Sequence, residues 1–207
     1  FDKKLKPGYI CYSPSVVINN LVTTNSLAGG NYIDFSIGIL QEFQKTGEDI
    51  ILLPHSIGDG KNIKHCDLAL CKLIYNKLEN KEKIHLINDT KLTYAQARAI
   101  INGSQFYLTG RYHSLTSALI NLVPVVPLSW HVKYSDVINM FTKKDVSIDV
   151  YSTSVEDAID KIMNQYNDRN WYNIEEMKSN IISVTEEVQK SMDLINNEII
   201  KWRAKHA

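Results

Sequence analysis

Residues 104–119, SQFYLTGRYHSLTSAL, change character at Gly110. The apolar run before Gly110 is typical of a buried strand, and the residues after it have the spacing of an amphipathic helix. Arg111 and His113 stand at the turn between the two. In an open parallel sheet, ligands bind beyond the carboxyl ends of the strands, where free N–H groups of the next helix attract anions. The segment therefore predicts an anion site at a strand–turn–helix junction.

Apolar runs and helix-like segments alternate along the rest of the chain. The runs that predict strands lie at residues 9–13, 50–53, 84–87, 104–109, 125–129 and 146–151. Segments with helical spacing follow them, beginning near residues 33, 67, 94, 112, 135 and 155. The run at 50–53 is apolar throughout, which is typical of a strand buried on both faces of a parallel sheet. Six alternations predict a Rossmann-like α/β fold, a doubly wound parallel sheet with helices on both faces.

Local signals refine this prediction. A polar, glycine-rich loop through residues 25–30 is expected between the first strand and the first helix. Thr93 and Gln96 have the spacing of a capping box, which predicts a helix start there. Pro127 lacks an N–H group and therefore indicates that its strand lies near an edge or a bulge.

The last part of the chain has a different pattern. From Trp171 onward, apolar residues recur mostly every three or four positions with no Gly or Pro between them, which predicts one long amphipathic helix. We therefore divide the chain into a Rossmann-like domain over residues 1–168 and a long helix over residues 169–207. We expect the apolar stripe of that helix to pack either against this domain or against a neighbouring domain or subunit.

The composition excludes several classes of protein. Hydrophobic residues make up 44% of the 207 residues and charged residues 22%, as in ordinary globular proteins. No apolar run approaches the length of about 18 residues that a membrane span needs. With 23 basic and 23 acidic residues and no basic stripe, a nucleic-acid partner has little electrostatic support. Three cysteines without metal-ligand spacing (Cys11, Cys66 and Cys71) predict reduced core thiols, no disulfide and a cytoplasmic location.

Polar side chains follow most of the predicted strands. Because the carboxyl ends of parallel strands meet at one edge of a sheet, we expect these side chains to share that edge. Each alone has an ordinary structural explanation, but cations that converge with helix N-termini describe a site for a small polyanion, a phosphate or carboxylate. The residues are Ser13, His55, Asn88, Asp89, Arg111, His113, His131 and Lys133.

Other kinds of site are less well supported. A zinc site formed by His55, His113 and His131 is disfavoured because no two of them are three or four residues apart on one element and their neighbours are cationic. Residues 58–61, GDGK, lack the spacing of a P-loop. Ser114 is not surrounded by the G-x-S-x-G elbow of a serine nucleophile. We therefore expect no metal in this site.

Several of these residues resemble one family in order and spacing. Leu53-Pro54-His55, Asp67 at a helix start, the turn at 110–114, the V-P-V-V run at 123–126 and Lys133 resemble the polysaccharide pyruvyl transferase family. The resemblance covers residues 9–145. It implies a GT-B enzyme with two Rossmann-like halves, of which this chain corresponds to the C-terminal half. The implied reaction transfers a pyruvyl group from phosphoenolpyruvate to a sugar as a ketal, during synthesis of a cell-surface polysaccharide.

The resemblance also implies roles for single residues. It implies that His113 is the general acid and that Arg111 holds the anion of the donor. Further donor contacts are expected from His55, Lys133, Ser13, His131 and Ser114. Phosphoenolpyruvate is then a substrate, and no cofactor is expected. The implied partners are a small anionic donor, a sugar or glycan acceptor, and either an N-terminal domain or a second copy bound through the final helix.

The sequence departs from the family pattern at two positions and leaves two other functions open. Tyr112 stands where the family usually has leucine, and Trp130 where it commonly has tyrosine. One alternative is a GT-B glycosyltransferase half that binds a nucleotide-sugar, for which only Asp89 and Trp130 offer ribose and base contacts. The other is a non-catalytic module that binds an anion or mediates assembly through the final helix.

Overall fold

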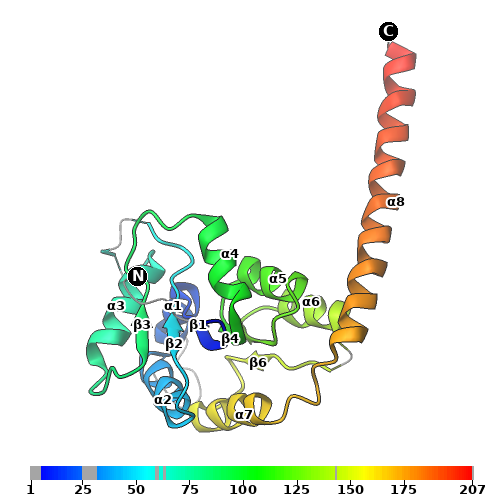
Figure 1. Cartoon of the computed structure of the whole chain (residues 1–207). Helices are drawn as coiled ribbons and strands as arrows, with labels where there is room; N and C mark the ends of the chain where they lie inside the picture. Colours follow the sequence, from blue (N-terminus) through cyan, green and yellow to red (C-terminus); the bar gives the residue numbers. More distant parts are fainter. Residues whose placement is uncertain (1–5, 25–31, 59–60, 63, 143, 207) are drawn as a thin grey trace.

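The fold is a single parallel sheet of six strands covered by helices (Figure 1). The computed structural model describes residues 6–24, 32–58, 61–62, 64–142 and 144–206. The strand order is β3-β2-β1-β4-β5-β6, and every pair is parallel. This order is that of a Rossmann fold, so the predicted fold class is confirmed. The strands are β1 Tyr9–Ser13, β2 Ile50–Leu52, β3 Ile84–Leu86, β4 Ser104–Thr109, β5 Val125–Ser129 and β6 Ile148–Asp149.

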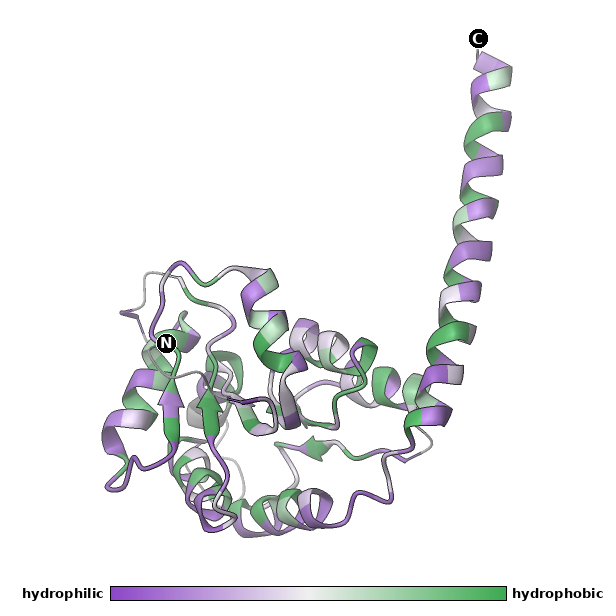
Figure 2. Cartoon of the chain, in the orientation of Figure 1, coloured by the Kyte–Doolittle hydropathy of each residue, from purple (hydrophilic) through white to green (hydrophobic). Residues whose placement is uncertain are grey.

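Helices cover both faces of the sheet, because successive residues of each buried strand point to opposite faces. One face packs against α1 (Val16–Thr24), α2 (Tyr32–Lys45), α3 (Asp67–Lys77) and α7 (Val155–Asn167). The other face packs against α4 (Tyr94–Asn102), α5 (Tyr112–Ile120), α6 (Lys133–Phe141) and the start of α8 (Ile174–His206). Both cores are built from aliphatic and aromatic side chains. Figure 2 shows hydrophilic and hydrophobic residues alternating along most of these helices, as expected for helices with one buried face.

The chain reverses its winding direction between β1 and β4, which are neighbours at the centre of the sheet. Tyr12 of β1 lies opposite Leu52 of β2 on one side and Leu108 of β4 on the other. The helix that follows β1 packs on one face and the helix that follows β4 packs on the other. The loops at the carboxyl ends of these two strands therefore diverge, which places the ligand crevice of a doubly wound sheet at this point.

The structure confirms one local prediction and adds a helix that was not predicted. The capping box is present, since Thr93 Oγ1 accepts from the backbone N–H of Gln96 while the Gln96 side chain accepts from the backbone N–H of Thr93. Helix α1 was not expected, because its sequence is rich in β-branched residues of modest helix propensity. Burial of Val16 and Ile18 against the sheet stabilises it. The predicted glycine-rich loop at 25–30 lies outside the described residues.

Helix α8 leaves the domain after its first turns and projects away from it (Figure 1). Met177 is buried against the domain, and Asn180 Nδ2 donates to the carbonyl oxygen of Phe141 at 3.1 Å. Every described residue from 185 to 206 is exposed. The predicted domain boundary at 168 falls between the end of α7 and the start of α8. Among the described residues, no helix combines the length and the apolar character that crossing a membrane requires.

Candidate active site at the carboxyl edge of the sheet

A buried ion pair lies at the centre of this edge. Asp67, at the start of α3, has no exposed surface, and the Arg111 side chain is 19% exposed. Arg111 Nε donates to one carboxylate oxygen at 2.8 Å and Nη2 to the other at 2.5 Å. The same carboxylate accepts the backbone N–H groups of Val16 at 2.9 Å and Ser56 at 2.7 Å. One side chain therefore connects the loops that follow β1, β2 and β4.

This pair changes the interpretation of Arg111. The family resemblance implies that the guanidinium holds the anion of the donor, whereas the structure directs two of its N–H groups to Asp67. Only the remaining N–H groups of Arg111 can serve a ligand. An acidic residue at a helix start is ordinarily explained by the helix dipole, so no local pattern indicates this long-range pairing.

His55 lies beside this pair, just beyond β2 and Pro54. Its Nδ1 atom is buried and has no hydrogen-bond partner among the described residues. Burial is the main cause of a lowered pKa for His55, and the positive charges of Arg111 and His113 lower it further, while Asp67 acts in the opposite direction. The lowered pKa favours the neutral imidazole, in which one ring nitrogen is a base and the other an N–H donor.

His113 occupies the first turn of α5 and is exposed to solvent. Its ring packs edge-on against Tyr112, with ring centroids 6.0 Å apart. Ser56, the neighbour of His55, and Arg111 both donate to the Asp67 carboxylate, and His113 follows Arg111 by two residues. The structure therefore brings these three predicted residues to one edge. His113 is the most accessible of them, at a helix N-terminus that favours an anion nearby.

Lys133, at the start of α6, lies in a cage of three aromatic rings. Its Nζ atom is 4.8 Å from the ring centroid of Trp130, 5.1 Å from that of Tyr112 and 5.8 Å from that of Tyr134. The rings attract the ammonium group through their negative faces and limit its movement. The Tyr134 hydroxyl donates to the carbonyl oxygen of Gly110 at 2.9 Å, so the cage is joined to the turn before Arg111.

Gly110 allows α1 to approach this turn closely. A Cβ atom at Gly110 would lie 2.5 Å from Cδ1 of Ile18 and 2.8 Å from Cβ of Ser15. Real Cβ atoms are essentially never this close to other heavy atoms, so any side chain here would displace α1 or the turn. The glycine is therefore required by packing at the point where the loops diverge.

Two of the predicted donor-binding serines are buried. The Ser13 hydroxyl accepts from the Tyr107 hydroxyl at 2.7 Å. The Ser114 hydroxyl donates to the carbonyl oxygen of Arg111 at 2.9 Å and lies 2.8 Å from Thr109 Oγ1. These contacts favour a role in ordering the strand ends, and direct donor binding by either serine stays a prediction.

The other predicted polar residues lie at the periphery of the site. His131 is exposed, and its Nδ1 atom accepts the backbone N–H of Lys133 at 3.3 Å. Asn88 and Asp89 are exposed beyond β3, the edge strand, and so lie away from the central loops. Their part in ligand binding also stays a prediction.

Two basic residues next to the ion pair were not predicted from the sequence. An open depression of about 460 Å³ lies between α1 and the loop that precedes α3. Lys64 and His65 contribute to its wall together with Arg111, and they precede α3 in a polar loop that has no recognisable pattern. Only the folded chain places them beside Arg111. The full lining is Val16, Val17, Asn20, Leu21, Ser56, Lys64, His65 and Arg111.

The sequence pattern of the polysaccharide pyruvyl transferase family matches residues 5–132, which is more than half of the chain. The chain belongs to the polysaccharide pyruvyl transferase family. The match includes β1, β2, β4 and β5 with the turn that carries Arg111 and His113. Lys133 lies immediately after it. No curated protein matches the chain significantly.

Solved structures with a similar fold support the GT-B assignment of this family member. The UDP-GlcNAc 2-epimerase of Methanocaldococcus jannaschii, in complex with UDP-GlcNAc and UDP, is 15% identical with a TM-score of 0.53, over 88% of this chain and 46% of that one. The glycotransferase of kitacinnamycin is 9% identical with a TM-score of 0.52, over 95% and 45% of the two chains. At such identities the likeness concerns the fold alone. The chain spans less than half the length of both structures.

Three further features of this pyruvyl transferase family member concern the site and its surroundings. The positions that depart from the family pattern, Tyr112 and Trp130, both contact Lys133. Among the described residues, no group of three or more His, Cys, Asp or Glu side chains is arranged to hold a metal ion. Cys11, Cys66 and Cys71 are buried free thiols.

Proposed function

We propose that this chain is the donor-binding half of a polysaccharide pyruvyl transferase that transfers pyruvyl from phosphoenolpyruvate to a sugar. The observation that carries the proposal is the turn with Arg111 and His113 at the carboxyl edge of the sheet, beside His55, in a chain of this family. The product is a ketal on a sugar or glycan that belongs to a cell-surface polysaccharide. The reaction takes place in the cytoplasm.

The donor carries a carboxylate and a phosphate, and the site offers several cations for them. The free N–H groups of Arg111, the ammonium group of Lys133 and the N-terminus of α5 are donors at this edge. Lys64 adds positive charge on the side of α1, next to His65. Charge-assisted hydrogen bonds to both ends of phosphoenolpyruvate would orient its double bond across the exposed ring of His113.

Ketal formation needs one proton at carbon and two carbon–oxygen bonds. In our proposal protonated His113 gives its proton to the methylene carbon, and a first sugar hydroxyl attacks the adjacent carbon. The bond from that carbon to the phosphate oxygen then breaks, inorganic phosphate leaves, and a second sugar hydroxyl attacks to close the ketal. The two hydroxyl protons are lost to bases, and His55, whose lowered pKa favours the neutral imidazole, is our candidate for one of them.

A ligand comparison tests this proposal with the chain itself. Phosphoenolpyruvate should raise the melting temperature of the protein, and UDP-, GDP- and CMP-sugars should not. The Arg111→Lys variant should lose most of this effect, while Arg203→Lys on α8 serves as a control of equal charge. Stabilisation by a nucleotide-sugar but not by phosphoenolpyruvate would instead support the glycosyltransferase function. If neither ligand binds, a non-catalytic module becomes the better explanation.

A further inference from the structure

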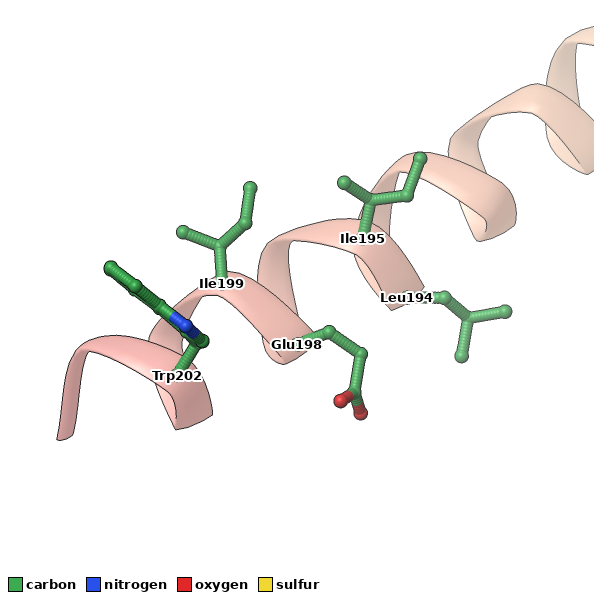
Figure 3. A pocket seen from close by; sticks show the side chains of 5 residues that line it. All are labelled: Leu194, Ile195, Glu198, Ile199 and Trp202. Carbon is green, nitrogen blue, oxygen red and sulfur yellow. The ribbon is translucent and has the colours of Figure 1, made fainter. Parts of the chain in front are cut away.

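Helix α8 carries a narrow apolar stripe that no described residue covers beyond its first turns. Its later members are strongly exposed, with 57% exposure at Val188 and 61% at Trp202. Figure 3 shows Ile195 and Ile199 projecting from the same side of the helix, with Trp202 one turn further on. We name these residues the α8 stripe: Ile181, Val184, Val188, Met192, Ile195, Ile199 and Trp202.

The length of α8 makes such exposure costly. The helix has 33 residues and is therefore about 50 Å long. Most helical stability in proteins comes from packing of an apolar face, and exposed ion pairs such as Lys201–Glu198 add little. Spacings of three and four residues confine the α8 stripe to the narrow seam that is typical of helices paired in a coiled coil. The stripe is therefore suited to packing against a second helix.

The charges of α8 favour a second, antiparallel copy of the helix over a membrane surface as the partner of the α8 stripe. The helix has six acidic and five basic residues, so it lacks the basic polar face that favours binding to an anionic membrane surface. Its charges are unevenly placed, with Glu186 and Glu187 before the exposed part of the stripe and Lys201, Arg203 and Lys205 at the end. A parallel pair of α8 helices would bring like charges together. An antiparallel pair places the acidic segment of each helix beside the basic segment of the other.

We propose that α8 pairs antiparallel with α8 of a second copy of this chain along the α8 stripe. In the register that we propose, Met192 faces Ile199 of the partner subunit. Ideal helix geometry places Glu187 and Lys205 on the same flank of the stripe, so Glu187 then lies near Lys205 of the partner subunit. The two α/β domains stand at opposite ends of the paired helices and do not compete for space. This assembly is independent of the proposed catalytic function.

Sedimentation velocity on the 207-residue chain tests the pairing. The wild-type chain should be a dimer, and Ile195→Asp should weaken dimerisation at least 100-fold by placing a charge in the stripe. The matched control is Asn197→Asp, which adds the same charge on the opposite side of α8 and should change the dissociation constant less than threefold. Unchanged circular dichroism of the Ile195→Asp variant verifies that the domain still folds. A wild-type chain that stays monomeric at 100 μM would overturn the proposal, and another part of a longer polypeptide or another protein would then cover the stripe.

Two further measurements test the orientation. Glu187→Lys and Lys205→Glu should each weaken the dimer, and the double variant should recover most of the loss because opposite charges face each other again. Spin labels on Ala204→Cys should be about 25 Å apart in an antiparallel pair, since the helix rises 1.5 Å per residue. Labels in close contact, or no recovery in the double variant, would refute the antiparallel arrangement. A monomer that binds phosphatidylcholine–phosphatidylserine vesicles would show that a membrane covers the stripe instead.

Discussion

Arg111 and Asp67 form a two-pronged ion pair in which the carboxylate is completely buried. Asp67 also accepts two backbone N–H groups, so each of its oxygens has two donors. A buried charge is tolerated only when it is paired and hydrogen-bonded in this way. The pair therefore fixes the loops after three strands relative to one another. We regard Asp67 as the residue that positions Arg111, and through it the turn that carries His113.

Replacing Asp67 with Asn should destabilise the protein strongly. The change removes the negative charge but leaves the guanidinium of Arg111 largely buried, and breaking such a pair costs about 3–5 kcal/mol. Urea unfolding measures the loss, with Glu42→Gln at the exposed Lys45–Glu42 pair as the control. The double variant Asp67→Asn/Arg111→Gln should lose less than the sum of the single variants. A loss below about 1 kcal/mol for Asp67→Asn would show that the pair does not hold the loops together.

Replacing Arg111 with Lys separates charge from geometry. Lysine keeps the positive charge, but its single ammonium group cannot make two parallel hydrogen bonds to Asp67 and also bind phosphoenolpyruvate, as the planar guanidinium group can. Charge-assisted hydrogen bonds are worth about 1.5–3 kcal/mol, so phosphoenolpyruvate should bind about 10- to 100-fold more weakly. Calorimetric titration at a temperature where the variant is folded measures this. Unchanged affinity would assign Arg111 a structural role only.

The helices and strands of this fold were predictable from the sequence where residues close together in the chain determine them. The capping box at Thr93 predicts a helix start, and the apolar run at 50–53 predicts a buried strand. Each prediction depends only on residues that are neighbours in the sequence. Helix α1 was not predictable in this way, because its residues prefer strands and it is stabilised by packing on the sheet and by the carboxylate of Asp67. Such tertiary contacts override a weak local preference.

The candidate site was predictable in its location but not in its pairing. Parallel strands deliver their carboxyl ends to one edge, so the positions of His55, Arg111 and His113 followed from the strand assignments. The Arg111–Asp67 pair joins residues 44 positions apart, and the cage around Lys133 depends on the direction in which Tyr112 points. Neither has a local signature, because each depends on how separate elements pack.

Replacing Gly110 with Ala should destabilise the turn without removing any charge. The new Cβ would meet Ile18 and Ser15 at distances shorter than real contacts, and such overpacking typically costs about 1–3 kcal/mol. For a protein of this size we expect the melting temperature to fall by about 2–4 °C for each kcal/mol. Gly47→Ala tests backbone conformation instead, since Gly47 has φ +79° and open space around it. Wild-type stability of Gly110→Ala would mean that α1 can move away from the turn.

His55 should make stability depend on pH near neutrality. Its pKa in the folded protein lies below the ordinary value of 6.5, so between these two values the unfolded chain binds a proton that the folded chain does not. Stability should therefore fall as pH decreases below about 6.5 and should level off above it. Urea unfolding at pH 7.5 and pH 5.5 measures this difference. His55→Asn should reduce the difference, whereas His206→Asn at the exposed end of α8 should leave it unchanged. An equal difference in the His55→Asn variant would assign the pH dependence to other groups.

His113 provides the sharpest test of the proposed chemistry, because it is exposed and its replacement should not disturb the core. Glutamine at this position can still donate a hydrogen bond but cannot give up a proton at neutral pH. In an active enzyme that contains this chain, His113→Gln should lower turnover about 100- to 10,000-fold, the usual contribution of a general acid. Affinity for phosphoenolpyruvate should change less than threefold, in contrast to Arg111→Lys.

Phosphate release measures turnover, and calorimetric titration measures donor binding on the same preparations. His206→Gln at the exposed end of α8 is the matched control, and it should retain the turnover because this histidine lies outside the site. Equal turnover in the His113→Gln variant and the wild type would remove His113 from the mechanism and leave His55 as the histidine to examine.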